Sequence, residues 1–96
     1  MGISNKSFRI AEDIMRDMRQ TAYAKMTYQQ VDCAFDEDHW EFEGYSLMVG
    51  VYTDNVDVVY YDDGGAFIDD YETARHELAT TIQLIFDDAA EYEVQS

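Results

Sequence analysis

Residues 31–63 carry the pattern that most constrains the fold, because strand-forming apolar side chains alternate there with carboxylates. The apolar runs are residues 31–35, 40–42, 45–52 and 56–61. Polar, mostly acidic clusters that are typical of turns separate the runs, at residues 36–38, 53–55 and 62–65. This arrangement predicts an antiparallel β-meander of three or four strands.

The first run also predicts where the only cysteine lies. Cys33 is in phase with Val31 and Phe35, so all three side chains share one face of a strand, and we expect that face to be buried. A buried thiol packs as a small apolar group and is not reactive. With one cysteine no internal disulfide can form, which favours a reducing cytoplasm.

The later runs predict a change of phase and a partly covered last strand. Trp40 and Phe42 share a face, but after Gly44 the regular apolar set is Tyr45, Leu47, Val49 and Val51. Gly44 therefore predicts a bulge or a turn between two strands. The run at residues 56–61 is apolar on both faces except at Asp57, which favours a central or partner-covered strand.

Amphipathic helices are predicted on both sides of the meander. The first runs from about Ser7 to Met26, with the apolar stripe Phe8, Ala11, Met15, Met18, Ala22 and Met26. The second runs from about Asp70 to Tyr92, with the stripe Tyr71, Ala74, Leu78, Ile82, Ile85, Ala89 and Tyr92. Asp69 and Glu72 resemble a capping box at its start. We therefore expect a single acidic α+β domain, residues 1–96, in which two helices cover one face of an antiparallel sheet.

Charge is the most unusual property of the composition. The chain holds 21 acidic and 6 basic residues, for a net charge of −15. Five of the bases lie in residues 1–30, whereas residues 31–96 hold 18 acids and one base. Solubility alone needs a net charge of roughly 2–8 in magnitude, so this surplus indicates an acidic surface with a function. The bases of the first helix are interpreted as its solvated face.

No pattern of catalytic or metal-binding residues is found in the sequence. His76 and Glu77 begin a zinc-protease motif, but its second histidine position holds Thr80. His39 is interpreted as a surface histidine, and the aspartates lack the spacing of a calcium loop. We expect no metal, no cofactor and no enzymatic activity. The sequence also shows no signal peptide and no membrane-spanning segment, so we expect a soluble cytoplasmic protein.

The placement of the acids predicts a partner-binding surface. Glu41 and Glu43 repeat at roughly 6.6–6.8 Å along one strand face, close to the step between successive phosphates of a nucleic acid. Several other acids lie near the end of the second helix, where the helix dipole disfavours them. The predicted partner-binding residues are Asp36, Glu37, Asp38, Glu41, Glu43, Asp54, Asp57, Asp62, Asp63, Asp87, Asp88, Glu91 and Glu93.

These features favour a DNA mimic that occupies the basic nucleic-acid-binding surface of an effector and does not itself bind nucleic acid. In size and composition the chain resembles the DNA-mimic inhibitors of phages and mobile elements, including anti-restriction and anti-CRISPR proteins.

Three alternatives stay open. The first is an acidic interaction or assembly module, which includes a homodimer. The meander holds more aromatic residues than one sheet face can bury. They are Trp40, Phe42, Tyr45, Tyr52, Tyr60 and Tyr61. The second is that the acidic surface is an adaptation of a protein from a salt-loving organism to high salt. The third is an enzyme that uses a carboxylate pair.

Overall fold

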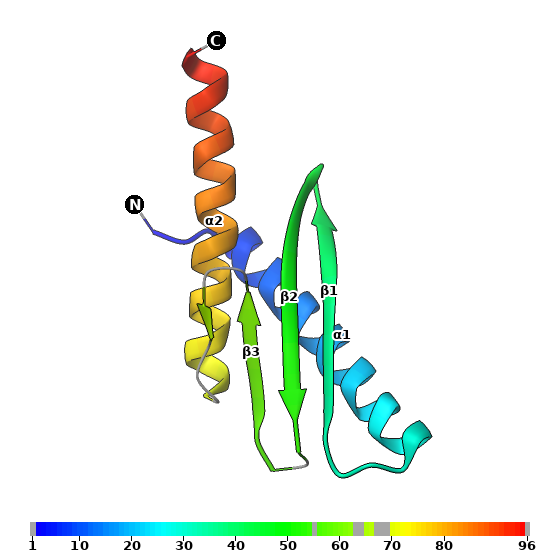
Figure 1. The fold of residues 1–96 in the computed structure, drawn as a ribbon. Coiled ribbons are helices and arrows are strands. Elements are labelled where there is room, and N and C mark those ends of the chain that lie inside the picture. Colours follow the sequence, from blue (N-terminus) through cyan, green and yellow to red (C-terminus); the bar gives the residue numbers. More distant parts are fainter. Residues whose placement is uncertain (1, 55, 63–64, 67–69, 96) are drawn as a thin grey trace.

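The computed structural model describes the backbone of residues 2–54, 56–62, 65–66 and 70–95, and the side chains of these residues except 65–66 and 91–95. Its elements, in order, are α1 (Asn5–Gln29), β1 (Ala34–Phe42), β2 (Tyr45–Thr53), β3 (Val58–Asp62), β4 (Gly65–Ala66) and α2 (Tyr71–Gln95). The predicted α+β architecture, a meander between two helices, is confirmed (Figure 1).

The sheet and the helices form two layers. The strands pair antiparallel in the order β1-β2-β3-β4, so β1 is an edge strand. α1 packs on β1 and β2, while α2 packs on β3 and on α1. Figure 1 shows α1 passing behind β1 and β2, and the last turns of α2 extending beyond the sheet. The opposite side of the sheet, called the open face below, carries every second residue of each strand.

Side chains and one left-handed residue cap the helices. The Ser4 hydroxyl accepts a hydrogen bond from the Ser7 backbone N–H at the start of α1. Gln30 adopts a left-handed conformation (φ 55°) at the other end, and its N–H reaches the last carbonyls of the helix. In α2 the Asp70 carboxylate accepts hydrogen bonds from the Thr73 hydroxyl and backbone N–H, at 2.7 and 2.9 Å. These bonds lower the pKa of Asp70. The cap predicted at Asp69 lies outside the described residues.

A two-residue turn joins β1 to β2 and confirms the turn predicted at Gly44. Phe42 pairs with Tyr45, and the residues between them, Glu43 and Gly44, both have positive φ, at 51° and 87°. Two positive φ values match the twist of a hairpin, and the second position is commonly glycine. Glu43 is less favourable there, but its carboxylate lies 2.6 Å from the Lys6 ammonium of α1, which holds the turn against the helix.

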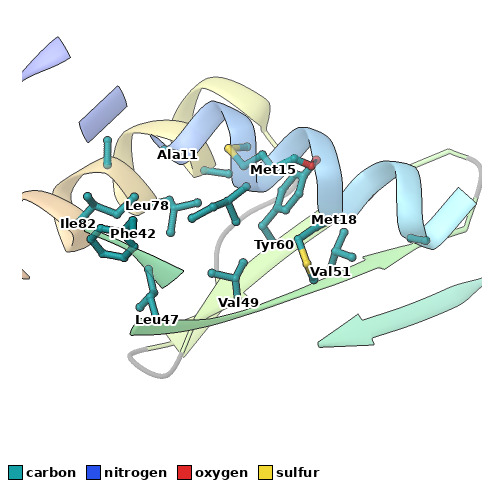
Figure 2. Close-up of a cluster of buried hydrophobic side chains, with 14 of the residues drawn as sticks. Ala11, Met15, Met18, Phe42, Leu47, Val49, Val51, Tyr60, Leu78 and Ile82 are labelled. Atoms are coloured by element: carbon teal, nitrogen blue, oxygen red, sulfur yellow. Dashed lines mark hydrogen bonds between the residues drawn. The ribbon is translucent and has the colours of Figure 1, made fainter. Parts of the chain in front are cut away.

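The core lies between the two layers and uses most of the predicted stripe of α1 but only part of that of α2. In α2, Ile85 and Ala89 are partly exposed, and the side chain of Tyr92 lies outside the described residues. Figure 2 shows α1 and α2 directing their apolar side chains onto those of the strands. The buried apolar residues are Ala11, Ile14, Met15, Met18, Ala22, Met26, Ala34, Phe42, Leu47, Val49, Val51, Tyr60, Ala74, Leu78, Ala79 and Ile82. Two polar tips find partners: the Tyr60 hydroxyl donates to the Met15 carbonyl at 3.3 Å, and the Trp40 indole N–H points at the Met18 sulfur at 3.0 Å.

The prediction for the first strand was wrong. Residues 36–38 do not form a turn but are the middle of one nine-residue strand that pairs with the whole of β2. A continuous strand has a single alternation, and Phe42 and Ala34 set it by facing the core. Phe35 has the opposite phase and is therefore exposed. Val31 and Cys33, which were also predicted to be buried in this strand, lie before it and are exposed as well.

Two further boundaries differ from expectation. The last long strand begins at Val58, and Val56 is exposed in the bend before it. Tyr71 was predicted in the buried stripe of α2, but it is 43% exposed because it is the first residue of the helix. The strand was predicted to be central or partner-covered. It lies between β2 and β4, but β4 pairs only with its last two residues, Tyr61 and Asp62.

Leu78 should be the most sensitive position of α2, because its side chain is fully buried between the layers. The substitution Leu78→Ala should lower the free energy of unfolding by about 2–5 kcal/mol, through lost burial and the cavity left behind. Leu84→Ala on the same helix is the matched control: Leu84 is 55% exposed, and we expect a loss below about 1 kcal/mol. Urea denaturation measures both values, and equal losses would contradict this placement of α2.

Candidate protein-binding surface

The densest line of predicted binding residues lies along the free edge of β1, the edge that faces away from β2. Asp36 and Asp38 lie on the helix side of the strand, and Glu37 and Glu41 on the open face. Asp36 and Asp38 are same-side neighbours, roughly 6.6–6.8 Å apart along the strand, whereas Glu37 and Glu41 are four residues and roughly 13 Å apart. The predicted repeat of Glu41 and Glu43 along one strand face is wrong, because Glu43 lies in the turn after Phe42. Together with Glu43 in the turn, these carboxylates form what we call the acidic edge.

Two lysines of α1 neutralise the ends of the acidic edge. Lys6 pairs with Glu43, and Lys25 lies 3.4 Å from Asp36 and donates to the Phe35 carbonyl at 2.9 Å. Both lysine side chains remain partly exposed, at 57% and 37%, so the solvated face predicted for these bases also makes contacts that the sequence did not predict. Both contacts tie the edge strand to the helix layer.

The middle of the acidic edge carries negative charge with no ion pair among the described residues. Glu37, Asp38 and Glu41 are exposed. Glu37 accepts a hydrogen bond from the Tyr61 hydroxyl at 3.1 Å, and Asp38 accepts one from the His39 backbone N–H at 2.8 Å. Each retains oxygen lone pairs for an incoming cation.

Elsewhere the predicted binding residues lie apart from this edge or have structural roles. Asp54 accepts hydrogen bonds from the backbone N–H groups of Asp57 and Val56, at 2.9 and 3.1 Å, and these bonds lower its pKa. Asp54 therefore closes the bend before β3. Asp62 is buried, and Asp57 is exposed beside that bend.

The acids of α2 are only partly described. Asp87 accepts a hydrogen bond from the Gln83 amide at 3.0 Å, and Asp88 is exposed. The side chains of Glu91 and Glu93, and all of Asp63, lie outside the described residues. The structure therefore does not bring the predicted residues into one patch, and the acidic edge is the set that it does bring together.

The open face adds aromatic residues to this edge. Phe35 and Tyr52 are opposite each other in the β1–β2 pairing and are 51% and 40% exposed. Tyr61 of β3 stacks against Phe35, with ring centroids 5.7 Å apart and a tilt of 21°. The excess of meander aromatics predicted a second aromatic face, and Tyr52 and Tyr61 lie there. Phe35 was not predicted on this face, because it was assigned to the buried side. Alternation counted back from Phe42 along one continuous strand would have placed Phe35 on the open face.

A glycine allows Tyr61 to reach across the sheet. Gly50 lies between Glu37 and Tyr61 in the strand pairing. A Cβ atom at Gly50 would lie 2.0 Å from the Tyr61 Cζ atom, so only glycine leaves room for the ring. The ring covers the β2 backbone, and its hydroxyl meets the Glu37 carboxylate. Burial and this neighbouring carboxylate raise the pKa of Tyr61 to about 12.

One hollow among the described residues lies between α1, β3 and the start of α2. It has a volume of about 210 Å³ and is lined by Arg19, Val56, Asp57, Val58, Tyr60 and Tyr71. This lining contains no serine, cysteine or histidine, so it holds neither a Ser–His nor a Cys–His pair. Among the described residues, no group of three or more His, Cys, Asp or Glu side chains is placed to hold a metal ion.

Over its described residues, neither helix combines the length and apolarity needed to cross a membrane. Comparison of the chain with protein-family models, curated proteins and solved structures finds no match. Conclusions about function therefore depend on the surfaces described above.

Alkaline pH should destabilise the fold through two tyrosines. Burial raises the pKa of Tyr60 and of Tyr61 to about 12, whereas an unfolded tyrosine ionises near 10. The folded state therefore holds these protons more tightly, and the associated stability is complete below pH 10 and is lost between pH 10 and 12. Denaturation at a series of pH values should show this fall, and Tyr61→Phe should reduce it.

Tyr28→Phe is the matched control, because Tyr28 is 90% exposed at the end of α1. The control should follow the pH dependence of the unmodified protein. A Tyr61→Phe protein with the same alkaline fall as that control would contradict the described environment of Tyr61.

Proposed function

We propose that this protein is a non-enzymatic inhibitor that occupies the basic nucleic-acid-binding surface of an effector, and that the acidic edge is its contact. The observation that carries the proposal is the run of exposed carboxylates Glu37, Asp38 and Glu41, without ion pairs in the described chain, on the free edge of β1. An effector that binds phosphates through Lys and Arg would meet carboxylates there with which its cations can pair.

Rigidity supports this proposal. β1 is paired to β2 over its full length, and Lys6 and Lys25 hold its two ends to α1. The carboxylates are therefore positioned before binding, so little conformational entropy is lost when the partner arrives. Their mutual repulsion is relieved by the partner's cations, and the net charge of −15 attracts a basic surface over a long range.

The same charges indicate which kind of partner can bind this edge. A second copy that paired its own β1 with this edge would bring acidic residues next to one another, which destabilises strand pairing. A nucleic acid would be repelled for the same reason. A basic protein surface is the partner that the edge favours, and the proposed host is a cell in which a phage or mobile element expresses the inhibitor in the cytoplasm.

One observation favours a second candidate, an acidic protein-interaction or assembly module that does not compete with nucleic acid. The exposed aromatic rings of Phe35 and Tyr52 are typical of protein interfaces. A homodimer through the open face belongs to this candidate. Competition with DNA distinguishes the two functions.

Displacement of DNA tests the proposal directly. Labelled DNA bound to restriction and CRISPR effector complexes should be released by the protein, and release should weaken as salt rises. The variant Glu37→Gln/Asp38→Asn/Glu41→Gln should inhibit roughly ten-fold less, because each exposed ion pair contributes about 0.2–1 kcal/mol. Fluorescence anisotropy measures both effects.

A control with the same loss of charge separates the edge from the general field of the protein. Asp13→Asn/Asp17→Asn/Glu77→Gln removes three carboxylates from α1 and α2, and we expect inhibition close to that of the unmodified protein. Equal effects of the two triple variants would reject the acidic edge as the contact. Retention of DNA by every effector, together with stable binding of the protein to one of them, would favour the second candidate.

A further inference from the structure

The open face beside the acidic edge combines flat aromatic rings with the carboxylate of Glu37, which lies in the same row of paired residues as Tyr61. We propose that this surface, formed by Phe35, Glu37, Glu41, Tyr52 and Tyr61, binds arginine side chains of the partner in preference to lysine. The inference deepens the proposed function, because it names which cations of a basic surface are recognised. We call this surface the arginine face.

The rings offer planes onto which a guanidinium group can stack. Phe35 and Tyr52 are adjacent across β1 and β2, and both are substantially exposed. Tyr61 stacks on Phe35 at 5.7 Å and, because Gly50 leaves room, lies across β2. The aromatic surface thus continues over three strands. A planar guanidinium gains both stacking and cation–π attraction on such a surface.

The Glu37 carboxylate lies where the edge of a stacked guanidinium would point. Tyr61 donates to one oxygen of Glu37 at 3.1 Å, which fixes that carboxylate beside the ring. Glu41 lies on the same face of β1, but four residues and roughly 13 Å beyond Glu37, where it can pair with a second arginine of the partner. An arginine on the rings can donate its outer N–H groups to Glu37, and paired N–H···O bonds are stronger than single ones. An ammonium group is a compact point charge without a planar face, so it uses the carboxylates but stacks poorly.

Charge complementarity excludes the other obvious occupants of this face. A second copy placed here would bury Glu37 and Glu41 against the same carboxylates of its partner, and unpaired buried charges are costly. An anionic lipid or nucleic acid meets the same repulsion. A purely apolar partner would cover the rings but leave both carboxylates without a cation. A surface rich in arginine satisfies the rings and the carboxylates together.

Two peptides test the preference without an identified effector. Nona-arginine and nona-lysine carry equal charge, and isothermal titration at one ionic strength gives the affinity of the unmodified protein for each. We expect the arginine peptide to bind roughly ten-fold more tightly, from stacking and bidentate pairing together. Phe35→Leu keeps an apolar side chain of similar size but removes the planar ring. It should reduce the arginine preference to roughly two-fold while leaving the lysine affinity unchanged.

Two further variants separate the parts of the arginine face. Tyr61→Phe keeps the ring but removes the hydroxyl that holds Glu37, and we expect an arginine preference between those of the unmodified protein and Phe35→Leu. Tyr28→Leu is the matched control, because it removes an exposed ring at the end of α1, away from the sheet, and should leave the preference unchanged. Circular dichroism of each variant establishes that the fold is retained.

Equal affinity for the two peptides, absence of binding to both, or an undiminished preference in Phe35→Leu would each overturn the inference. These outcomes are independent of the DNA-displacement result. A protein that displaces DNA but binds both peptides equally would remain an inhibitor without arginine recognition. A protein that prefers arginine but displaces no DNA would retain the arginine face and lose the proposed function.

Discussion

The antiparallel pairing of β1 with β2 is the constraint on which the other features of the surface depend. The turn at Glu43 and Gly44 places Phe42 opposite Tyr45, and from there every residue of β1 is assigned to one of two sides. One side meets the helices and completes the core. The other side presents Phe35, Glu37 and Glu41. A shift of one residue in this pairing would bury carboxylates and expose the core residues, so the fold and the proposed binding surface depend on the same register.

The few basic residues of α1 and α2 stabilise the fold at points where the acids would otherwise weaken it. Lys6 and Lys25 hold the ends of the edge strand, and Arg75 of α2 joins Glu12 of α1 at 3.0 Å. Arg75 also pairs with Glu72, and these carboxylates raise its pKa. Each of these exposed pairs contributes little by itself. The pairs of Lys6, Lys25 and Arg75 with residues of other elements reduce repulsion between those elements, and they leave the middle of the acidic edge without a cation in the described chain.

The helices and the second strand could be predicted because their patterns are long and regular. The stripe from Ala11 to Met26 repeats over many turns, and the alternation in β2 is unbroken from Tyr45 to Val51. The bounds of the first strand could not be predicted correctly, since three adjacent carboxylates at residues 36–38 resemble a turn in composition. Only the pairing with β2 shows that an edge strand accommodates them, because its free side is solvated.

The candidate surface was predictable in its chemistry but not in its extent. The excess of acids and of aromatic rings is visible in the composition, and it indicates a surface beyond what stability requires. Which acids act together depends on contacts between residues distant in the chain. Glu43 joins Lys6, and Asp54 closes a local bend, so neither is equivalent to Glu41. Such differences follow from tertiary structure and have no signal in local sequence.

The lack of a side chain at Gly50 also has a consequence for the evolution of the sequence. Any larger residue at this position would collide with the Tyr61 ring, so a chain that gains a side chain there must lose the ring or displace it. The two positions are therefore expected to change together over evolutionary time, although they lie on different strands. In diverging relatives, a glycine at one position together with a tyrosine at the other would mark chains that keep the aromatic surface, even where the surrounding acids have been exchanged.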